Sequence, residues 1–355
     1  MNQLQTLDAE TLMSTPLPSL RFVVDRLLPQ GLHILAGAPK IGKSWLALSL
    51  CLCVAKGEPV WGFPSAKGSV LYLCLEDNYA RIQRRLFELT EDAPAALHLA
   101  TFSESIGTGL EEQLTHFLTA HPDTVLVVID TLQKVRRTTS VANPYANDYQ
   151  DISSLKVLAD SHGVAVLLIH HLRKMNDEDP LNMISGTTGL SGATDSSFVL
   201  KPSKRGSDNA TLYCTGRDIA YRELLLHFRK DTHAWELSAP VEDEAERTDP
   251  TLILLSEFLS GLSAFDGTAT ELASLLEQQT GESLLPSVLS KKLVRYTSEL
   301  AAAGIRFSAT RTRDTRMLHI RCDGGDGNDG RSDTDPVANF LSQPSHLSQS
   351  PCPSQ

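Results

Sequence analysis

Several features of other protein classes are missing from this 355-residue sequence. No apolar run reaches the roughly 18 residues that a membrane-spanning helix needs. The first residues, MNQLQTLDAE, have neither the basic nor the apolar region of a signal peptide. The six cysteines form no C-x-x-C pair, so neither a zinc site nor a disulfide framework is indicated. We therefore expect a cytoplasmic protein without membrane contacts.

Positive charge is also in deficit. The chain has 32 Lys and Arg against 43 Asp and Glu, which gives a net charge of −11. This argues against a protein coated in basic surface. It does not exclude nucleic acid as a partner, because a ring-shaped motor can hold DNA in a basic pore while its outside is acidic. Basic residues must therefore be judged segment by segment.

The segment GAPKIGKS at 37–44 has the G-x-x-x-x-G-K-S spacing of a P-loop. A strand-like run, LHILAG, precedes it and a helical apolar run follows it, which argues against a chance match in a glycine turn. Lys43 would face the positive end of that helix, which is unfavourable unless an anion binds there. We predict ATP and Mg²⁺ as cofactors, with the Ser44 hydroxyl on the metal. The nucleotide-binding candidates are Gly37, Ala38, Pro39, Lys40, Ile41, Gly42, Lys43, Ser44 and Trp45.

Apolar strands alternate with helical patterns from residue 32 to about 201, after a proline-containing lead-in at 1–31. Strands that are apolar on both faces and alternate with helices indicate an α/β fold with a mostly parallel sheet covered on both sides. The expected strands are 69–76, 97–101, 124–130 and 164–171, and the expected helices are 79–90, 109–120 and 147–163. After residue 196, four β-type segments are expected to be antiparallel strands that close the sheet.

The remainder of the chain divides into three parts. Residues 239–250 are acidic and bounded by proline, as in a linker. Residues 251–322 have the pattern of three helices and a β-hairpin with a basic tip, which predicts a winged-helix-like α+β domain. Residues 323–355 are rich in polar residues, glycine and proline and are expected to be disordered. The ATPase domain would then be 1–238.

Two carboxylates follow apolar strands. Asp130 ends VLVVID, the pattern of a Walker B strand whose aspartate holds Mg²⁺; the alternative is a cap on the next helix. Thr131 follows it where many ATPases have a glutamate. Glu76, at the end of VLYLCLE, is therefore our candidate for the base that activates water, while Asp77 could merely cap a helix.

This order of P-loop, glutamate and Walker B aspartate resembles the RecA/DnaB superfamily more than the AAA+ proteins proper. The segments VLYLCLEDNYARIQRRL, VLVVIDTLQKV, VAVLLIHHLRK, SGTTGLSGATDSSFVL and TGRDIAYRELLLHF resemble RepA-type plasmid and phage replicative helicases, which are often described simply as AAA-family ATPases. The resemblance covers about residues 20–237. It implies a RecA-like domain that forms a ring, expected to be a hexamer, with ATP between subunits and single-stranded DNA in the channel.

The resemblance also implies roles for individual residues. His170 or His171 would sense the γ-phosphate, unless the pair is only structural. Arg217, or alternatively Arg81, would complete a neighbouring subunit's site as an arginine finger; either could instead form a surface ion pair. Two loops would contact single-stranded DNA through basic residues: Lys134, Arg136 and Arg137 in the first, Arg173 and Lys174 in the second. The first loop is favoured because acidic residues at 177–179 weaken the second.

Basic residues recur in the C-terminal domain. Lys291, Lys292 and Arg295 lie on its recognition-like helix, and Arg311, Arg313 and Arg316 lie on its hairpin. Such a pair of basic elements indicates duplex or fork DNA. A protein partner, such as a replication initiator or a ring neighbour, is an equal alternative.

We expect an ATP-hydrolysing ring motor that translocates on single-stranded DNA, a replicative helicase with a possible initiator or loader as partner. A different class stays open: an ATP-gated DNA-binding or regulatory module that does not translocate. A RecA-type recombination mediator is a further alternative.

Overall fold

The computed structural model describes residues 6–17, 19–136, 144–172, 179–184, 188–204, 206–238, 249–262, 264–311 and 316–322. At 144–151, 188, 189, 191 and 311 it describes the backbone alone. The described residues form two compact units. The large unit lies within Leu20–Val241, and the small unit combines residues of Met1–Ser19 with residues of Glu242–Asp335. The lead-in predicted at 1–31 is thus divided between the two units.

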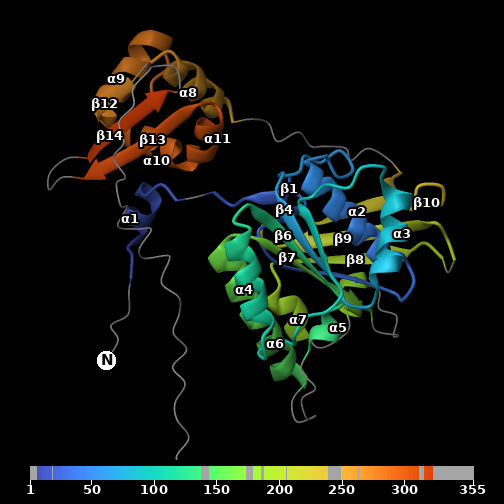
Figure 1. Cartoon of the computed structure of the whole chain (residues 1–355). Coiled ribbons are helices and arrows are strands. Elements are labelled where there is room, and N and C mark those ends of the chain that lie inside the picture. Colours follow the sequence, from blue (N-terminus) through green and yellow to red (C-terminus); the bar gives the residue numbers. More distant parts are fainter. Residues whose placement is uncertain are drawn as a thin grey trace, which may run out of the picture. The chain divides into compact units, whose positions relative to one another are not determined.

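A nine-stranded sheet forms the centre of the described large unit, in the order β11-β10-β9-β8-β3-β7-β6-β4-β5 (Figure 1). Its strands are β3 (Gly31–Gly37), β4 (Ser69–Cys74), β5 (Leu97–Ala100), β6 (Thr124–Asp130), β7 (Ala165–His171), β8 (Ser196–Pro202), β9 (Asn209–Gly216), β10 (Arg222–Arg229) and β11 (Ala234–Leu237). The strands from β3 to β8 pair in parallel, and β9 to β11 are antiparallel. The prediction of a mostly parallel sheet with antiparallel strands at one edge is confirmed.

One strand differs from the sequence prediction. We expected all four segments after residue 196 to be antiparallel, but β8 pairs in parallel with β3, with Ser196 beside His33 and Leu200 beside Gly37. The antiparallel run begins only at β9, which pairs with β8 from Pro202 beside Ala210 to Ser196 beside Gly216. The prediction was wrong for β8 because the direction of a strand depends on where the preceding connection ends. After β7 the chain enters β8 at the edge where β3 and β7 begin, so β8 runs parallel to them.

The parallel strands give the sheet two distinct edges. We call the edge at which β3, β4, β6 and β7 end the carboxyl edge, and the edge at which they begin the amino edge. Because β9 runs backwards, its last residue, Gly216, pairs with the first residue of β8 and lies at the amino edge.

Helices cover both faces of the sheet, as the apolar strands predicted (Figure 1). On one face α2 (Lys43–Lys56) and α3 (Tyr79–Leu89) pack with residues such as Leu46 and Ile82 in one core. On the other face α4 (Leu110–Ala120) and α6 (Pro144–His162) contribute Leu114 and Leu155 to a second core. Shorter elements of the large unit are β1 (Phe22–Val24), β2 (Leu28–Pro29), α5 (Leu132–Val135), the 3₁₀ helix η1 (Pro180–Met183) and α7 (Thr188–Ala193).

The small unit has its own apolar core. Its elements are α1 (Ala9–Ser14), α8 (Pro250–Ser260), β12 (Ala264–Thr268), α9 (Ala269–Thr280), α10 (Pro286–Arg295), α11 (Thr297–Ala302), β13 (Ile305–Arg311) and β14 (Arg316–Cys322). The strands form a three-stranded antiparallel sheet in the order β12-β14-β13. Three helices and a hairpin are present where the sequence indicated them, together with β12, α11 and the N-terminal α1, which it did not indicate.

Helix α1 lies beside α10 within this unit. The Ser19 hydroxyl donates to the Ser298 hydroxyl at 2.7 Å, and the Arg316 guanidinium donates to the Ser14 carbonyl. Among the described residues, no helix has both the length and the apolar character that crossing a bilayer requires.

The central strands should dominate the stability of the large unit. We expect Ile129→Ala, at a fully buried position of β6, to lower the free energy of unfolding by about 2–5 kcal/mol, because the cavity cannot collapse between two helix-covered faces. Val157→Ala on α6, where the side chain is 56% exposed, is the control and should change it by less than about 0.5 kcal/mol. All three tryptophans lie in the large unit, so tryptophan fluorescence in a denaturant titration reports on its unfolding. Equal effects of the two substitutions would contradict the packing described.

Candidate nucleotide site

The P-loop connects the end of β3 to the start of α2 at the carboxyl edge. Gly42 caps α2 in the left-handed region, with φ of 96°, a conformation that favours glycine. A Cβ at Gly37 would lie 3.1 Å from the Leu200 carbonyl oxygen, and one at Gly42 would lie 3.0 Å from Trp235 Nε1. A side chain at either position would crowd its neighbour, and at Gly42 it would also strain the backbone. The loop leaves the first N–H groups of α2 available to an anion.

Lys43 is buried, with 6% of its surface exposed. Its ammonium group donates to the carbonyl oxygens of Gly37 at 2.8 Å and Ala38 at 3.0 Å. Burial lowers the pKa of Lys43 to about 8, and the carboxylates of Asp130 and Glu76 partly offset this effect. The lysine is thus a desolvated cation that a phosphate could engage.

Asp130 ends β6 and is 4% exposed. Its carboxylate accepts a hydrogen bond from the Tyr72 hydroxyl at 2.9 Å, and the Ser44 hydroxyl hydrogen-bonds to it as well. Burial raises the pKa of Asp130, while the bonds from Ser44 and Tyr72 oppose the shift. A carboxylate and a hydroxyl in contact are hard oxygen donors of the kind that Mg²⁺ prefers, so Ser44 and Asp130 fit the predicted metal.

Glu76 follows β4 and is exposed to the same pocket. The buried hydroxyl of Thr131 donates to its Oε1 at 3.1 Å. In the sequence, Thr131 was notable only because it stands where many ATPases have a glutamate. In the structure, its hydroxyl holds the carboxylate of Glu76, which follows the neighbouring strand β4.

A pocket of about 1050 Å³ brings these groups together at the carboxyl edge. It is lined by the predicted residues Ala38 to Trp45, Glu76, Asp130 and His171, and also by Arg85, Thr131, Pro202, Gly206, Ser207, Asp208, Phe228 and Trp235. The last six come from the end of β8, the turn between β8 and β9, and from β10 and β11. Their contribution depends on the sheet order and could not be seen in the sequence.

Arg85 lines this pocket although it was not among the residues predicted from the sequence. Its guanidinium pairs with Asp77 at 2.5 Å and lies 5.3 Å from the centre of the Trp45 ring. Asp77 does not cap α3, as we had considered; Asn78 does, accepting from the Arg81 N–H at 2.9 Å. The signal available in the sequence was the spacing of Arg81 and Arg85, one helical turn apart, which places both on the same face of α3.

The structure distinguishes the two histidines at the end of β7. His171 lines the pocket, whereas His170 is buried in the protein and does not line it. This follows from the alternation of side chains along a strand. Of the two sensor candidates, His171 is therefore the one whose side chain faces the pocket.

Neither arginine-finger candidate lines the pocket of its own chain. Arg81 is exposed on α3 and pairs with Asp77 at 2.7 Å. Arg217 follows β9 at the amino edge, opposite the pocket, and contacts Asp195.

The DNA-binding candidates are only partly described. Lys134 is exposed on α5, and Arg136 follows that helix. Arg137, Arg173, Lys174 and Arg313 lie outside the described residues, as does the side chain of Arg311. On α10, Lys291 and Arg295 are described, with Lys291 exposed, but Lys292 donates to Asp249 at 2.7 Å and is less available.

Comparisons with known proteins agree with this fold. Residues 2–177, just under half of the chain, match the family model described as an AAA domain. A solved structure of a single ATPase domain has a TM-score of 0.50 and 15% identity, over 59% of this chain and 85% of that chain. A DnaB-like replicative helicase, solved in a study of its interactions with primase, has a TM-score of 0.49 and 15% identity, over 60% of this chain and 58% of that chain. A search of the curated proteins found no match.

The predicted RecA-like P-loop fold is thereby confirmed, as is the resemblance to AAA-family ATPases. The match also supports the prediction of a nucleoside triphosphatase.

The lowered pKa of Lys43 predicts how nucleotide binding depends on pH. In the free protein the ammonium loses its proton as the pH rises through about 8. A phosphate needs the charged form, so we expect the affinity for a non-hydrolysable ATP analogue to fall above that pH, approaching tenfold per pH unit. Titration calorimetry from about pH 7.5 to about pH 9.5 measures it. Lys43→Arg keeps its charge throughout and should show no such decline; an equal decline in this variant would contradict the account.

The contact between Thr131 and Glu76 can be tested separately. Thr131→Val retains the shape of the side chain and removes the hydroxyl, so we expect kcat for ATP to fall by roughly tenfold or more while the affinity for the analogue stays unchanged, because only the orientation of Glu76 is lost. Thr124→Val, at the other end of β6, removes a hydroxyl that donates to the His121 carbonyl and is the control. Unchanged turnover in Thr131→Val would show that this bond does not position the base.

Proposed function

We propose that this protein is an ATP-hydrolysing motor that assembles as a ring and translocates on single-stranded DNA, as a replicative helicase of a plasmid, phage or similar element. The observation that carries the proposal is the position of Glu76, which Thr131 fixes beside Lys43 and Asp130 in one pocket. A protein that only binds ATP needs the lysine and the aspartate. A carboxylate that a buried hydroxyl orients toward the same pocket supports hydrolysis.

Each side chain has a distinct part in the proposed reaction. Lys43 exchanges the Gly37 and Ala38 carbonyls for oxygens of the outer phosphates. Ser44 and Asp130 would hold Mg²⁺, which neutralises phosphate charge. Glu76 accepts a proton from the water that attacks the γ-phosphorus, and the bond to the leaving ADP breaks. His171, at the end of β7, contacts the γ-phosphate and transmits its loss to the segment that follows.

The remaining proposed contacts are with other molecules: a neighbouring copy of this chain, single-stranded DNA and a partner of the small unit. Arg217 lies at the amino edge and would complete a site on a neighbouring copy, as in a ring. Lys134, Arg136 and Arg137 would contact the backbone of single-stranded DNA without sequence preference. Lys291 and Arg295 on α10 support a nucleic-acid or protein partner for the small unit, which we propose to be a winged-helix-like domain, with a replication initiator or loader as a candidate partner.

ATP turnover with and without single-stranded DNA, measured together with mass in solution, tests the proposal. We expect DNA to stimulate turnover and ATP to favour a species of ring size. Glu76→Gln should bind ATP with unchanged affinity and hydrolyse it about 10²-fold or more slowly, because the base is lost while the binding groups remain. Glu112→Gln, at an exposed position of α4 that does not line the pocket, is the control. Slow, DNA-independent turnover by a small species would contradict the motor and favour an ATP-gated switch. Normal turnover in Glu76→Gln would place the base elsewhere.

A further inference from the structure

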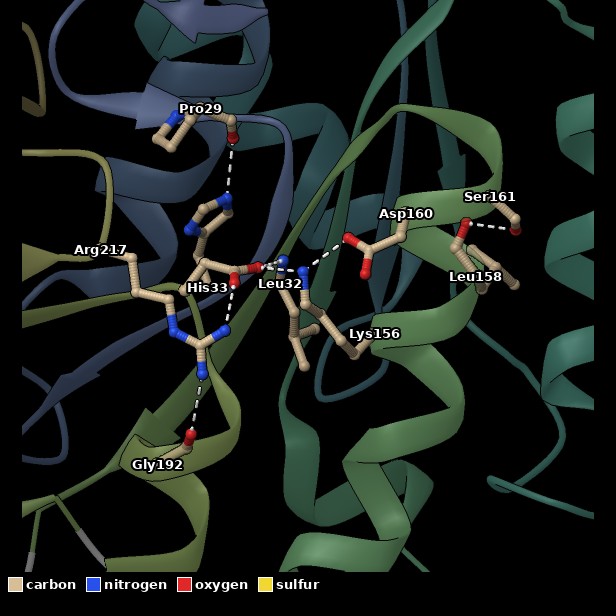
Figure 2. Close-up of polar contacts among 10 residues, drawn as sticks. Pro29, Leu32, His33, Lys156, Leu158, Asp160, Ser161, Gly192 and Arg217 are labelled. Atoms are coloured by element: carbon tan, nitrogen blue, oxygen red, sulfur yellow. Dashed lines mark hydrogen bonds and ion pairs between the residues drawn. The ribbon is translucent and has the colours of Figure 1, made fainter. Parts of the chain in front are cut away.

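A buried carboxylate lies at the amino edge, far from the nucleotide pocket. Asp195 stands between α7 and β8, and its side chain is 7% exposed. Its carboxylate accepts from the Leu32 N–H at 2.8 Å, the Lys156 ammonium at 2.7 Å and the Arg217 guanidinium at 3.4 Å. Lys156 lies on α6 and Arg217 follows β9, so the two basic side chains come from different elements (Figure 2). A charge removed from water needs such partners, so this carboxylate has a fixed position.

The backbone around Asp195 is fixed as well. Its N–H donates to the Leu32 carbonyl at 2.7 Å, and its own carbonyl accepts from the Arg217 N–H at 2.8 Å. At Gly31, where φ is 119°, a Cβ would lie only 2.4 Å from Asp195 Oδ2. The fold therefore reserves space for this carboxylate, which would be displaced by any side chain at position 31.

The guanidinium of Arg217 makes two contacts within the chain and is otherwise open to solvent. Its Nη1 contacts Asp195 at 3.4 Å. Its Nη2 donates to the Gly192 carbonyl at 3.4 Å (Figure 2). Yet 61% of the side chain is exposed. A guanidinium has five N–H donors, so these two contacts leave others directed to solvent. An arginine whose rotamer is restricted in this way loses less entropy when it meets an anion.

Arg217 is too far from the P-loop of its own chain to contact a nucleotide bound there. Leu32 is the second residue of β3, and Gly37, where the P-loop begins, is the last. Their separation along the strand is about 17 Å at the usual rise of a β-strand. Any phosphate that Arg217 contacts therefore belongs to another molecule.

We infer that Asp195 is a positioning residue, which directs Arg217 outward from the amino edge onto the triphosphate bound by a neighbouring copy of this chain. The inference rests on the proposed function, because it requires a ring in which the amino edge of one copy meets the pocket of the next. It adds a second requirement to that function: Arg217 supports ATP hydrolysis on the neighbouring copy only when the Asp195 carboxylate holds its guanidinium in place. Asp195 touches no substrate and acts only through Arg217.

Kinetics of Asp195→Asn test the inference. The amide oxygen can still accept from the Leu32 N–H, but the charge that holds Arg217 is lost. We expect DNA-stimulated kcat to fall by about 10- to 100-fold, as for a catalytic group displaced by an ångström, with KM for ATP within about twofold of wild type. Lys156→Met is the matched control: it removes another ion-pair partner of Asp195 and leaves Arg217 in place. It should lower the melting temperature at least as much as Asp195→Asn does and retain near wild-type kcat.

ATP turnover by mixed rings distinguishes a role across the subunit interface from a purely structural role of Asp195. In a mixture of Asp195→Asn with Lys43→Ala, some sites combine an intact P-loop with an intact Asp195 and Arg217 from the neighbour. We expect the mixture to turn over ATP faster than the sum of its separate components. No gain on mixing, or equal loss of kcat in Asp195→Asn and Lys156→Met, would overturn the inference and leave Asp195 as a structural group.

Arg217→Ala separates this inference from the proposed function. If it retains wild-type kcat, the contact between neighbouring copies in the proposed function is wrong. If it loses kcat while Asp195→Asn does not, the neighbour contact stands and the positioning role of Asp195 is wrong.

Discussion

An ammonium group taken out of water must find partners within the protein, and Lys43 finds them in the carbonyls of its own loop. Those bonds, at 2.8 and 3.0 Å to Gly37 and Ala38, draw the P-loop around the lysine. Burial still lowers its pKa to about 8, so the charged form of Lys43 is less favourable here than in water. A triphosphate would relieve that cost, and the nearby carboxylates of Asp130 and Glu76 define the side from which a metal and a water molecule can approach.

The parallel sheet explains why the chemistry gathers at one edge. Strands β3, β4, β6 and β7 all end there, and each contributes a group at or just after its last residue. Tyr72 and Thr131 then fix the two carboxylates through hydroxyl bonds of 2.9 and 3.1 Å. The opposite edge carries the buried Asp195 and the exposed guanidinium of Arg217. A ring that places one edge against the other would use both, which is the basis of our proposal.

The sequence predicted the local parts of this arrangement well. The P-loop, the apolar strands and Asp130 are each defined by neighbours in the chain, so spacing and periodicity were sufficient. The direction of β8, the bond from Thr131 to Glu76, and the place of Arg85 in the pocket depend on which strands and helices lie side by side. Asp195 is the clearest case: its partners Leu32, Lys156 and Arg217 are far apart in the sequence, and nothing in the segment SGATDSS indicated that its aspartate would be buried.

The most direct test of the central claim is a structure of the protein with Mg²⁺ and a non-hydrolysable ATP analogue. We expect Lys43 to leave the Gly37 and Ala38 carbonyls for the outer phosphates, with Ser44 and Asp130 at the metal. Glu76, still bonded to Thr131, should contact the water nearest the γ-phosphate. An analogue bound elsewhere, or Lys43 still on its loop carbonyls with Glu76 turned from the γ-phosphate, would contradict that claim.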